Sequence, residues 1–414
     1  MNFNNSMSYL SRAREIIPIC SQTFSKSPNY YPIGASPLFL QSGQGSHIWD
    51  VDNNEYIDYV LGLGPITLGY NYPTVNEAII RQLEEGVIFS LPHPLEVIVA
   101  KKLVEIIPCA EMVRFLKTGS EACQAAIRAA RAYTGRNHIA FRGYHGWHEF
   151  YTCTTERDKG IPKQYKQFMH QFEYNNIDSL EELFENYDLA AVIMEPMIVE
   201  PPTPGFLEGI RELCDSYGTI LIFDETVTGF RWSLNGAQEY FNVTPDLATF
   251  GKGMANGLPL AAVCGKKSIM KEFENIFVSS TFGGECLSLA AGLATIEVME
   301  RKKTIEHCWN MGTELISGLE KIGISNKGFP CRPIIIQEFS LEEKTLFIQE
   351  LIARNIIIHS GLFINLCYSH TREDIDKTII ACSEAIEIVN TAKAQNKVKD
   401  MLKGEIIIPA FKRL

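Results

Sequence analysis

The sequence lacks the features of a secreted or membrane protein. Its 11 cysteines are scattered singly between Cys20 and Cys382, their number is odd, and no two have C-x-x-C spacing. This distribution favours reduced thiols over a disulfide framework and predicts a cytoplasmic protein. Residues 1–10 are polar, without the basic and apolar pattern of a signal peptide. Residues 59–76, the least charged stretch, are too interrupted by Gly and Pro for a membrane helix.

Positive charge is also scarce. Lys and Arg number 38 against 49 Asp and Glu, which gives a net charge of −11. Such a chain has no general attraction for phosphate backbones, so nucleic acid is not an expected partner. The chain also lacks internal repeats and low-complexity tracts. What it does have is 414 residues, 46% of them hydrophobic, enough for one large domain and a smaller one.

From about residue 108 the chain alternates short apolar runs with longer segments of helical pattern. This alternation is typical of βα units that build a parallel sheet covered on both faces. The expected strands are 112–116, 138–142, 189–194, 219–223, 247–250 and 260–264, with helices such as 121–133 and 207–217 between them.

A second layer is predicted after a helix at 287–301. Its expected strands are 332–339, 355–359 and 363–368, beside helices 341–353 and 372–393. Residues 45–59 read as a hairpin with a turn at 52–54, expected to pack on this layer. The predicted organisation is an N-terminal segment 1–60, a large domain 61–301, a small domain 302–395 and a tail 396–414. The tail is basic with an apolar patch at 406–411, which indicates either a docked terminus or a subunit contact.

Thr118, Gly119 and Ser120 follow one expected strand and precede a helix. Backbone N–H groups at the positive end of a helix can bind a phosphate, and glycine allows it to approach closely. The alternative is an ordinary helix N-cap by Thr118 or Ser120.

Asp224 ends an expected central strand, and Lys252 stands between two glycines after another. A buried carboxylate at that sheet edge needs a cationic partner, for which a pyridinium nitrogen is suitable. A metal-ligating or a capping role for Asp224 stays open. A desolvated lysine with flexible neighbours can act as an amine nucleophile, although a plain surface lysine is the alternative.

Tyr144 and His145 begin a cluster, Tyr-His-Gly-Trp-His, after a further strand. The ring of Tyr144 or Trp147 suits stacking on a planar cofactor, and a metal site from His145 and His148 is the rival interpretation. Residues 279–284 offer hydroxyl and backbone donors before the helix that starts near residue 286.

We expect all five features to lie at strand ends along one edge of one sheet. A lysine, a buried aspartate, an aromatic ring and two phosphate cradles are together what is needed to hold pyridoxal 5'-phosphate (PLP) and react its aldehyde.

Four strings carry a resemblance to a known family: 118–122, 144–146, 223–231 and 250–253. Through them the sequence resembles the class III PLP-dependent aminotransferases of fold type I, in the glutamate-1-semialdehyde 2,1-aminomutase branch. The resemblance implies an α/β fold, with a large PLP-binding domain around a mostly parallel central sheet and a smaller α+β domain built from both chain ends. It also implies PLP as cofactor and a homodimer with its site at the subunit interface.

The resemblance assigns the catalytic roles to Lys252 and Asp224. Lys252 is expected to form a Schiff base with PLP and to carry a proton during the reaction. Asp224 is expected to keep the ring nitrogen protonated. Thr118, Gly119 and Ser120 would bind the phosphate.

Further cofactor contacts are implied around the ring. Tyr144 would stack on one face with His145 beside it, and Thr226 would press on the other, where the family usually has an aliphatic residue. Thr281 would reach the phosphate of the neighbouring subunit. Glu195 would contact the ring hydroxyl or a substrate amine, with a turn or salt-bridge role as the alternative.

The substrate side departs from the aminomutase. Residues 24–40 contain no Arg to grip a carboxylate, Leu63 replaces a Trp, and residues 281–285 read Thr-Phe-Gly-Gly-Glu. Lys26 cannot offer the planar two-pronged grip of Arg. We therefore expect an aminotransferase that uses an amino acid donor such as glutamate and a carbonyl acceptor. Its Tyr-His-Gly-Trp-His and Thr-Phe-Gly-Gly-Glu strings resemble those of enzymes of surface-polysaccharide and modified-sugar pathways, which implies a keto sugar or small phosphorylated ketone as acceptor. The alternatives are the aminomutase itself, a class III racemase, or a catalytically silent binding protein on the same fold.

Overall fold

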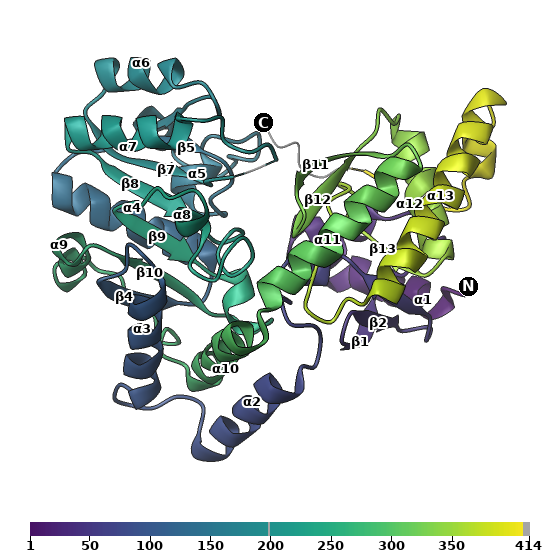
Figure 1. Ribbon diagram of the computed structural model, residues 1–414, viewed down its shortest axis with the longest axis horizontal. Helices are drawn as coiled ribbons and strands as arrows, with labels where there is room; N and C mark the ends of the chain where they lie inside the picture. The colour runs from purple at the N-terminus through teal and green to yellow at the C-terminus, as the bar shows by residue number, and fades with distance from the viewer. Residues whose placement is uncertain (198, 409–414) are drawn as a thin grey trace. The chain divides into compact units, whose positions relative to one another are not determined.

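The computed structural model describes residues 1–197 and 199–408 (Figure 1). The chain divides into two compact units, a terminal unit of Met1–Tyr72 with Glu306–Leu414 and a central unit of Pro73–Ile305. The α/β architecture with a smaller part built from both chain ends is confirmed. Among the described helices, none combines the length and hydrophobicity that crossing a bilayer requires.

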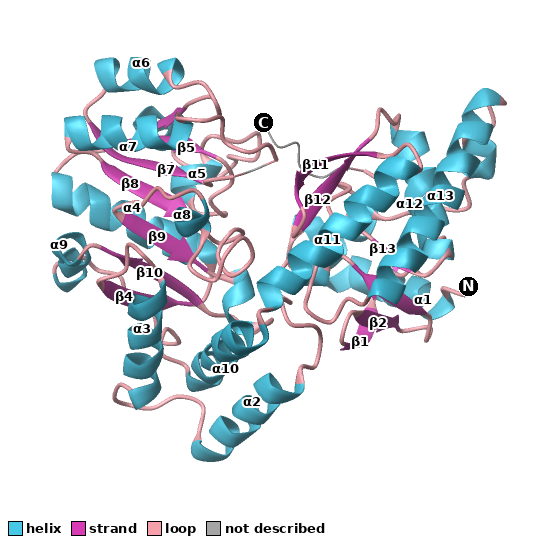
Figure 2. Ribbon diagram, viewed as in Figure 1, coloured by secondary structure: helices cyan, strands magenta, loops and turns pink. Residues whose placement is uncertain are grey.

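The central unit contains a seven-stranded sheet in the order β4-β10-β9-β8-β7-β5-β6 (Figure 2). The strands are β4 (Met112–Leu116), β5 (His138–Arg142), β6 (Met169–Gln171), β7 (Leu189–Met194), β8 (Ile220–Asp224), β9 (Leu247–Phe250) and β10 (Ala261–Gly265). The six predicted strands all form, within one residue of the expected bounds. The sheet is mostly parallel, as expected, but β10 runs antiparallel to both of its neighbours.

Helices cover both faces of this sheet. Strand β7 shows the two layers, because Ile193 belongs to the core with α4 (Gly119–Thr134) and Val192 to the core with α6 (Asp178–Asn186) and α7 (Phe206–Tyr217). Each fully buried side chain of this size contributes about 1.5–3 kcal/mol. Near-continuous apolar strands are therefore stable only in the middle layer.

The remaining helices of the central unit lie around this core. They are α2 (Pro73–Glu85), α3 (Pro94–Ile106), α5 (Glu149–Thr152), α8 (Ala237–Tyr240), α9 (Lys267–Met270) and α10 (Cys286–Lys302). Helix α10 packs against both α2 and α3.

The strand order brings the ends of β4, β5, β7, β8 and β9 to one edge of the sheet. Because β10 is antiparallel to both β4 and β9, the last residues of those strands lie beside its start: Leu116 pairs with Ala261, and Phe250 pairs with Ala262. The segments that follow these strands are consequently neighbours.

The terminal unit has its own sheets and core. Its four-stranded sheet has the order β1-β2-β3-β13, and β11 pairs with β12. The strands are β1 (Leu40–Gln44), β2 (His47–Asp50), β3 (Glu55–Asp58), β11 (Ser325–Phe329), β12 (Arg332–Ile336) and β13 (Ile356–Ile357), and the helices are α1 (Asn4–Ile16), α11 (Thr304–Lys321), α12 (Leu341–Ala353) and α13 (Arg372–Ala394). The predicted hairpin forms as β2 and β3, and its strand β3 joins this layer by pairing with β13.

The strand predicted at 363–368 is wrong. That segment makes only an isolated bridge. Its successive N–H groups donate to different neighbours, Ile364 to the carbonyl of Pro333 and Asn365 to that of Tyr59. A chain that alternates between two partners satisfies its backbone without forming a ladder with either.

The tail docks on the terminal unit as far as it is described. Ile407 is buried, its N–H donates to Thr345 Oγ1 at 3.2 Å, and the N–H of Ile408 donates to the carbonyl of Asn29. Residues 409–411 of the predicted apolar patch lie outside the described residues.

Candidate functional site

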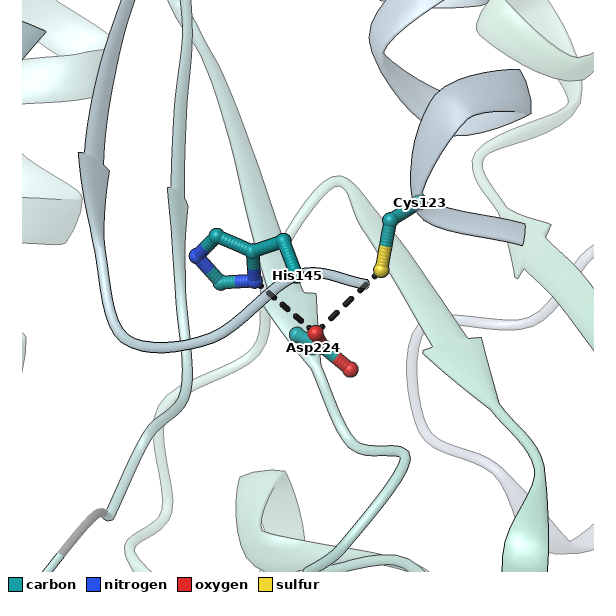
Figure 3. Close-up of side chains that lie close together, drawn as sticks. All are labelled: Cys123, His145 and Asp224. Carbon is teal, nitrogen blue, oxygen red and sulfur yellow. Dashed lines mark hydrogen bonds and ion pairs between the residues drawn. The ribbon is translucent and has the colours of Figure 1, made fainter. Parts of the chain in front are cut away.

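Asp224, the last residue of β8, lies at the sheet edge described above, and only 3% of it is exposed. Its Oδ2 lies 2.8 Å from His145 Nδ1 and 3.2 Å from Cys123 Sγ (Figure 3). Its Oδ1 accepts from the backbone N–H of Thr226 at 3.1 Å and from Thr249 Oγ1 at 3.2 Å. Four donors therefore surround one carboxylate.

These donors keep Asp224 charged. Burial is the largest influence and raises its pKa, but the hydrogen bond and charge of His145, with the donations from Thr226 and Cys123, outweigh it and lower the pKa to about 2. Because a carboxylate only accepts hydrogen bonds, His145 Nδ1 must carry a proton. The site thus presents a buried anion, which suits a cationic ring nitrogen.

The start of α4 is where the sequence predicts a phosphate cradle. Thr118 Oγ1 accepts from the N–H of Glu121 at 3.2 Å, and the Glu121 carboxylate accepts from the N–H of Thr118 at 2.9 Å, a capping box. The side chain of Thr118 is therefore used as an N-cap. A Cβ atom added to Gly119 would lie 2.7 Å from Thr226 Cγ2, so the close approach requires glycine. The first N–H groups of a helix have no partner within it and can face an anion.

Lys252 directly follows Gly251 at the end of β9 and opens a short 3-10 helix, Lys252–Ala255. Its φ of 37° is in the left-handed region, which costs a non-glycine residue roughly 1 kcal/mol or more. A Cβ atom added to Gly251 would lie 3.5 Å from Thr226 Cγ2 and 3.7 Å from the backbone nitrogen of Gly119. The segment that carries Lys252 thus lies against the start of α4 and against Thr226.

The loop that carries Tyr144 and His145 is held between α4 and β7. The N–H of Trp147 donates to Ser120 Oγ at 3.3 Å, and the N–H of Tyr144 donates to Glu195 Oε2 at 3.3 Å. Glu195 is 8% exposed, whereas Tyr144 is 40% exposed. Glu195 therefore holds the backbone of this loop.

Thr281 is not joined to these residues by any interaction found among the described part of the chain, and it is exposed. The expectation that all five features follow strands is wrong here, because this loop comes after a 3-10 helix at Lys271–Glu274. The loop still lies near the same edge: a Cβ atom added to Gly283 would be 3.0 Å from the carbonyl oxygen of Phe115 in β4.

The rival metal pair of His145 and His148 is not what the fold assembles. His145 instead lies with Cys123 and Asp224, whose possible ligand atoms are within 4.8 Å of one another. Sulfur, nitrogen and carboxylate oxygen suit zinc, but here the histidine and the thiol are each hydrogen-bonded to the carboxylate.

Sequence reasoning missed Cys123 and Thr249. A signal for Cys123 was its place one helical turn after Gly119, on the same face of α4. Thr249 could not be assigned without the register of the sheet, in which it pairs with Asp224.

The residues present fit PLP. Thr226 Oγ1 is buried without a hydrogen-bond partner among the described residues, and it lies beside Gly119 and Gly251, which carry no side chains. Around it converge an anion for a ring nitrogen, a helix start for a phosphate and the backbone of a lysine that can bind an aldehyde.

Comparison with known proteins gives the family. Residues 30–329 match the family described as "Aminotransferase class-III". The chain belongs to the class III aminotransferases. It is a PLP-dependent transaminase of fold type I, on the glutamate-1-semialdehyde aminomutase-like branch. Transaminases of this family generally act on small molecules and form dimers.

Two curated relatives of this class III aminotransferase carry different names. The "3-aminobutyryl-CoA aminotransferase" of Cloacimonas acidaminovorans is 38% identical over 402 residues, covering 92% of this chain and 96% of the relative. The "Glutamate-1-semialdehyde 2,1-aminomutase 2" of Brevibacillus brevis is 36% identical, covering 89% and 98%.

Solved structures agree with the fold. The FumI protein of Sphingopyxis sp. MTA144, in its PLP internal aldimine form, superposes with a TM-score of 0.89 at 26% identity, covering 94% of this chain and 97% of that one. An omega-transaminase from Sphaerobacter thermophilus gives 0.86 at 28% identity, covering 93% and 98%.

Proposed function

We propose that this class III aminotransferase moves an amino group from an amino acid, such as glutamate, to a carbonyl acceptor that has no carboxylate beside the reacting carbon. The observation that carries the proposal is the buried, anionic Asp224, which lies 2.8 Å from His145 Nδ1. Thr226, two residues further along the chain, lies against Gly251, the residue before Lys252. A buried anion, a helix start and an amine in one place suit PLP chemistry.

Bound PLP supplies an electron sink that stabilises the charge left when a proton leaves the carbon bearing the amino group. Asp224 would bind the ring nitrogen and hold its proton. The amine of Lys252 would bind the cofactor's aldehyde carbon and, once the substrate's amine has displaced it, would carry a proton between the substrate carbon that bears the nitrogen and that cofactor carbon. The N–H groups of Gly119 and Ser120 would bind the phosphate. Tyr144 would flank one face of the ring and Thr226 the other.

The proposed acceptor follows from the lack of a carboxylate grip. Residues 24–40 contain no Arg, and Lys26 offers only a point charge. The relative named 3-aminobutyryl-CoA aminotransferase acts, by its name, on an amine whose acid is masked as a thioester. We therefore propose a ketone carried on an acyl-CoA thioester as a third acceptor to test, beside a keto sugar and a small phosphorylated ketone.

A survey of acceptors with glutamate as donor tests this proposal. We expect the purified protein to aminate at least one neutral, phosphorylated or thioester ketone faster than glutamate semialdehyde. Strong turnover of glutamate semialdehyde alone would reject the proposed acceptor class.

The second candidate is isomerisation, which the aminomutase relative at 36% identity favours. An aminomutase or racemase needs no second substrate, because the nitrogen returns to the same molecule. Transfer of nitrogen-15 from labelled glutamate to an acceptor supports transamination, and retention of all nitrogen within one substrate supports isomerisation.

We also propose a cytoplasmic homodimer in which Thr281 completes the partner's site. Support comes from large apolar side chains exposed near it in the central unit, Phe277 at 85% and Phe282 at 59%, and from cysteines that are free and mostly buried. Sedimentation tests the dimer. Mixing Lys252→Ala with Thr281→Ala protein tests the shared site, because a hybrid dimer regains one intact site only if Thr281 acts across the interface.

A further inference from the structure

Cys123 shares an oxygen atom of Asp224 with His145. Its Sγ lies 3.2 Å from Oδ2, and the two side chains approach the carboxylate from different elements, α4 and the loop after β5 (Figure 3). Cys123 is 1% exposed. Burial, followed by the charge of Asp224, raises the pKa of this thiol well above its usual range, so the sulfur keeps its proton and can donate it.

The carboxylate has no acceptor capacity to spare. A carboxylate offers about four lone-pair directions. Two are used at Oδ2 by His145 and Cys123, and two at Oδ1 by Thr226 and Thr249. A protonated ring nitrogen arriving at Asp224 is a fifth donor, so one of the four must give way.

The thiol is the donor that gives way most easily. An S–H group is a weak donor, whereas His145 is an N–H donor and the N–H of Thr226 belongs to the fixed backbone. A second acceptor is also within reach, because Cys123 Sγ lies 3.5 Å from Thr249 Oγ1. The thiol hydrogen can turn from Asp224 to this hydroxyl while the sulfur stays in place.

We infer that Cys123 is a positioning residue with two hydrogen-bonded states, donating to Asp224 until the ring nitrogen of PLP binds there and to Thr249 afterwards. The inference rests on the proposed function, in which Asp224 receives that nitrogen. It adds that the ring nitrogen replaces the Cys123 thiol as a donor to the carboxylate. The charge of Asp224 therefore stays fully hydrogen-bonded both before and after PLP binds.

The S–H stretching band in the infrared reports the acceptor of the thiol directly. The band of Cys123 is assigned from the difference between the spectra of wild type and Cys123→Ala. The matched control is Cys214, another fully buried thiol of the central unit, whose band is assigned in the same way with Cys214→Ala. We expect the Cys123 band to move to higher wavenumber when PLP is added to the PLP-free protein, because a neutral hydroxyl is a weaker acceptor than a carboxylate. The Cys214 band is expected to stay.

A double-mutant cycle gives a second readout. Thr249→Val removes the alternative acceptor, and we expect it to weaken PLP binding by roughly three- to tenfold more in wild type than in the Cys123→Ala background. PLP binding with an unchanged Cys123 band and equal costs in the two backgrounds would overturn this inference alone. Failure of the wild type to bind PLP would instead overturn the proposed function and this inference with it.

Discussion

The Nδ1 atom of His145 lies 2.8 Å from Oδ2 of Asp224, although the two residues are 79 positions apart in the sequence. Both side chains are nearly fully buried. Because α/β sheets collect the ends of their parallel strands at one edge, the loop that follows β5 and the last residue of β8 meet there. This contact is the reason that a carboxylate in the protein interior stays ionised.

The charge of Asp224 predicts acid sensitivity. Its pKa is about 2 in the fold and near 3.9 in an unfolded chain, so the stability it contributes is present above about pH 4 and is lost as the pH falls towards 2. Between pH 6 and pH 3 we expect the wild type to lose about 1 kcal/mol more unfolding free energy than Asp224→Asn. Urea unfolding of PLP-free protein at the two pH values measures this. Equal losses in both proteins would contradict the assigned pKa.

Gly119 should be intolerant of a side chain. In Gly119→Ala the new methyl group would lie 2.7 Å from Thr226 Cγ2, which forces the helix start away from the residue two positions after Asp224. We expect PLP affinity to fall by roughly tenfold or more, with a smaller effect on stability, as fluorescence titration and thermal unfolding would show.

Gly209→Ala is the matched control. It lies inside α7, and its added methyl would meet Ile177 only at an ordinary 3.5 Å. This variant should keep wild-type PLP affinity and gain slightly in stability, because alanine is the better helix former. Equal affinities for the two alanine variants would show that the α4 start does not hold the phosphate.

Two threonines with buried hydroxyl groups predict opposite effects of the same substitution. Thr226 Oγ1 has no hydrogen-bond partner in the described part of the chain, whereas Thr249 Oγ1 donates to Asp224 at 3.2 Å. Thr226→Val should therefore raise the unfolding free energy of PLP-free protein by about 1 kcal/mol, and Thr249→Val should lower it by about as much. Denaturant unfolding compares them directly. A loss of stability in Thr226→Val would mean that its hydroxyl is not an unpaired group.

The fold could be predicted from the sequence where burial alone decides it. Strands such as β7 and β9 are continuous apolar runs bounded by small or polar residues, and their bounds were predicted without error. β6 was missed because three residues, Met-His-Gln, carry no such pattern. The strand predicted at 363–368 was wrong because most apolar residues of this segment are buried while its backbone makes irregular hydrogen bonds instead of pairing with a strand.

The site was predictable only as separate parts. Asp224 and His145 each follow a recognisable strand, so both could be singled out. Cys123 lies 101 residues from Asp224 on the buried face of a helix, and its thiol has a role only through that contact. The pairing of Thr249 with Asp224 depends on strand order, which local pattern does not determine.

The central claim is that Lys252 forms the Schiff base with PLP, and the lysine that holds PLP can be identified directly. Borohydride reduction of the PLP-loaded protein fixes the cofactor to whichever amine holds it, and peptide mass spectrometry then locates the added mass. Lys267→Ala, a change at an exposed lysine of α9, serves as the control beside Lys252→Ala. The account predicts one phosphopyridoxyl group on the peptide that contains Lys252, retained in Lys267→Ala and lost in Lys252→Ala. A label on another lysine, or no label on any, would contradict it.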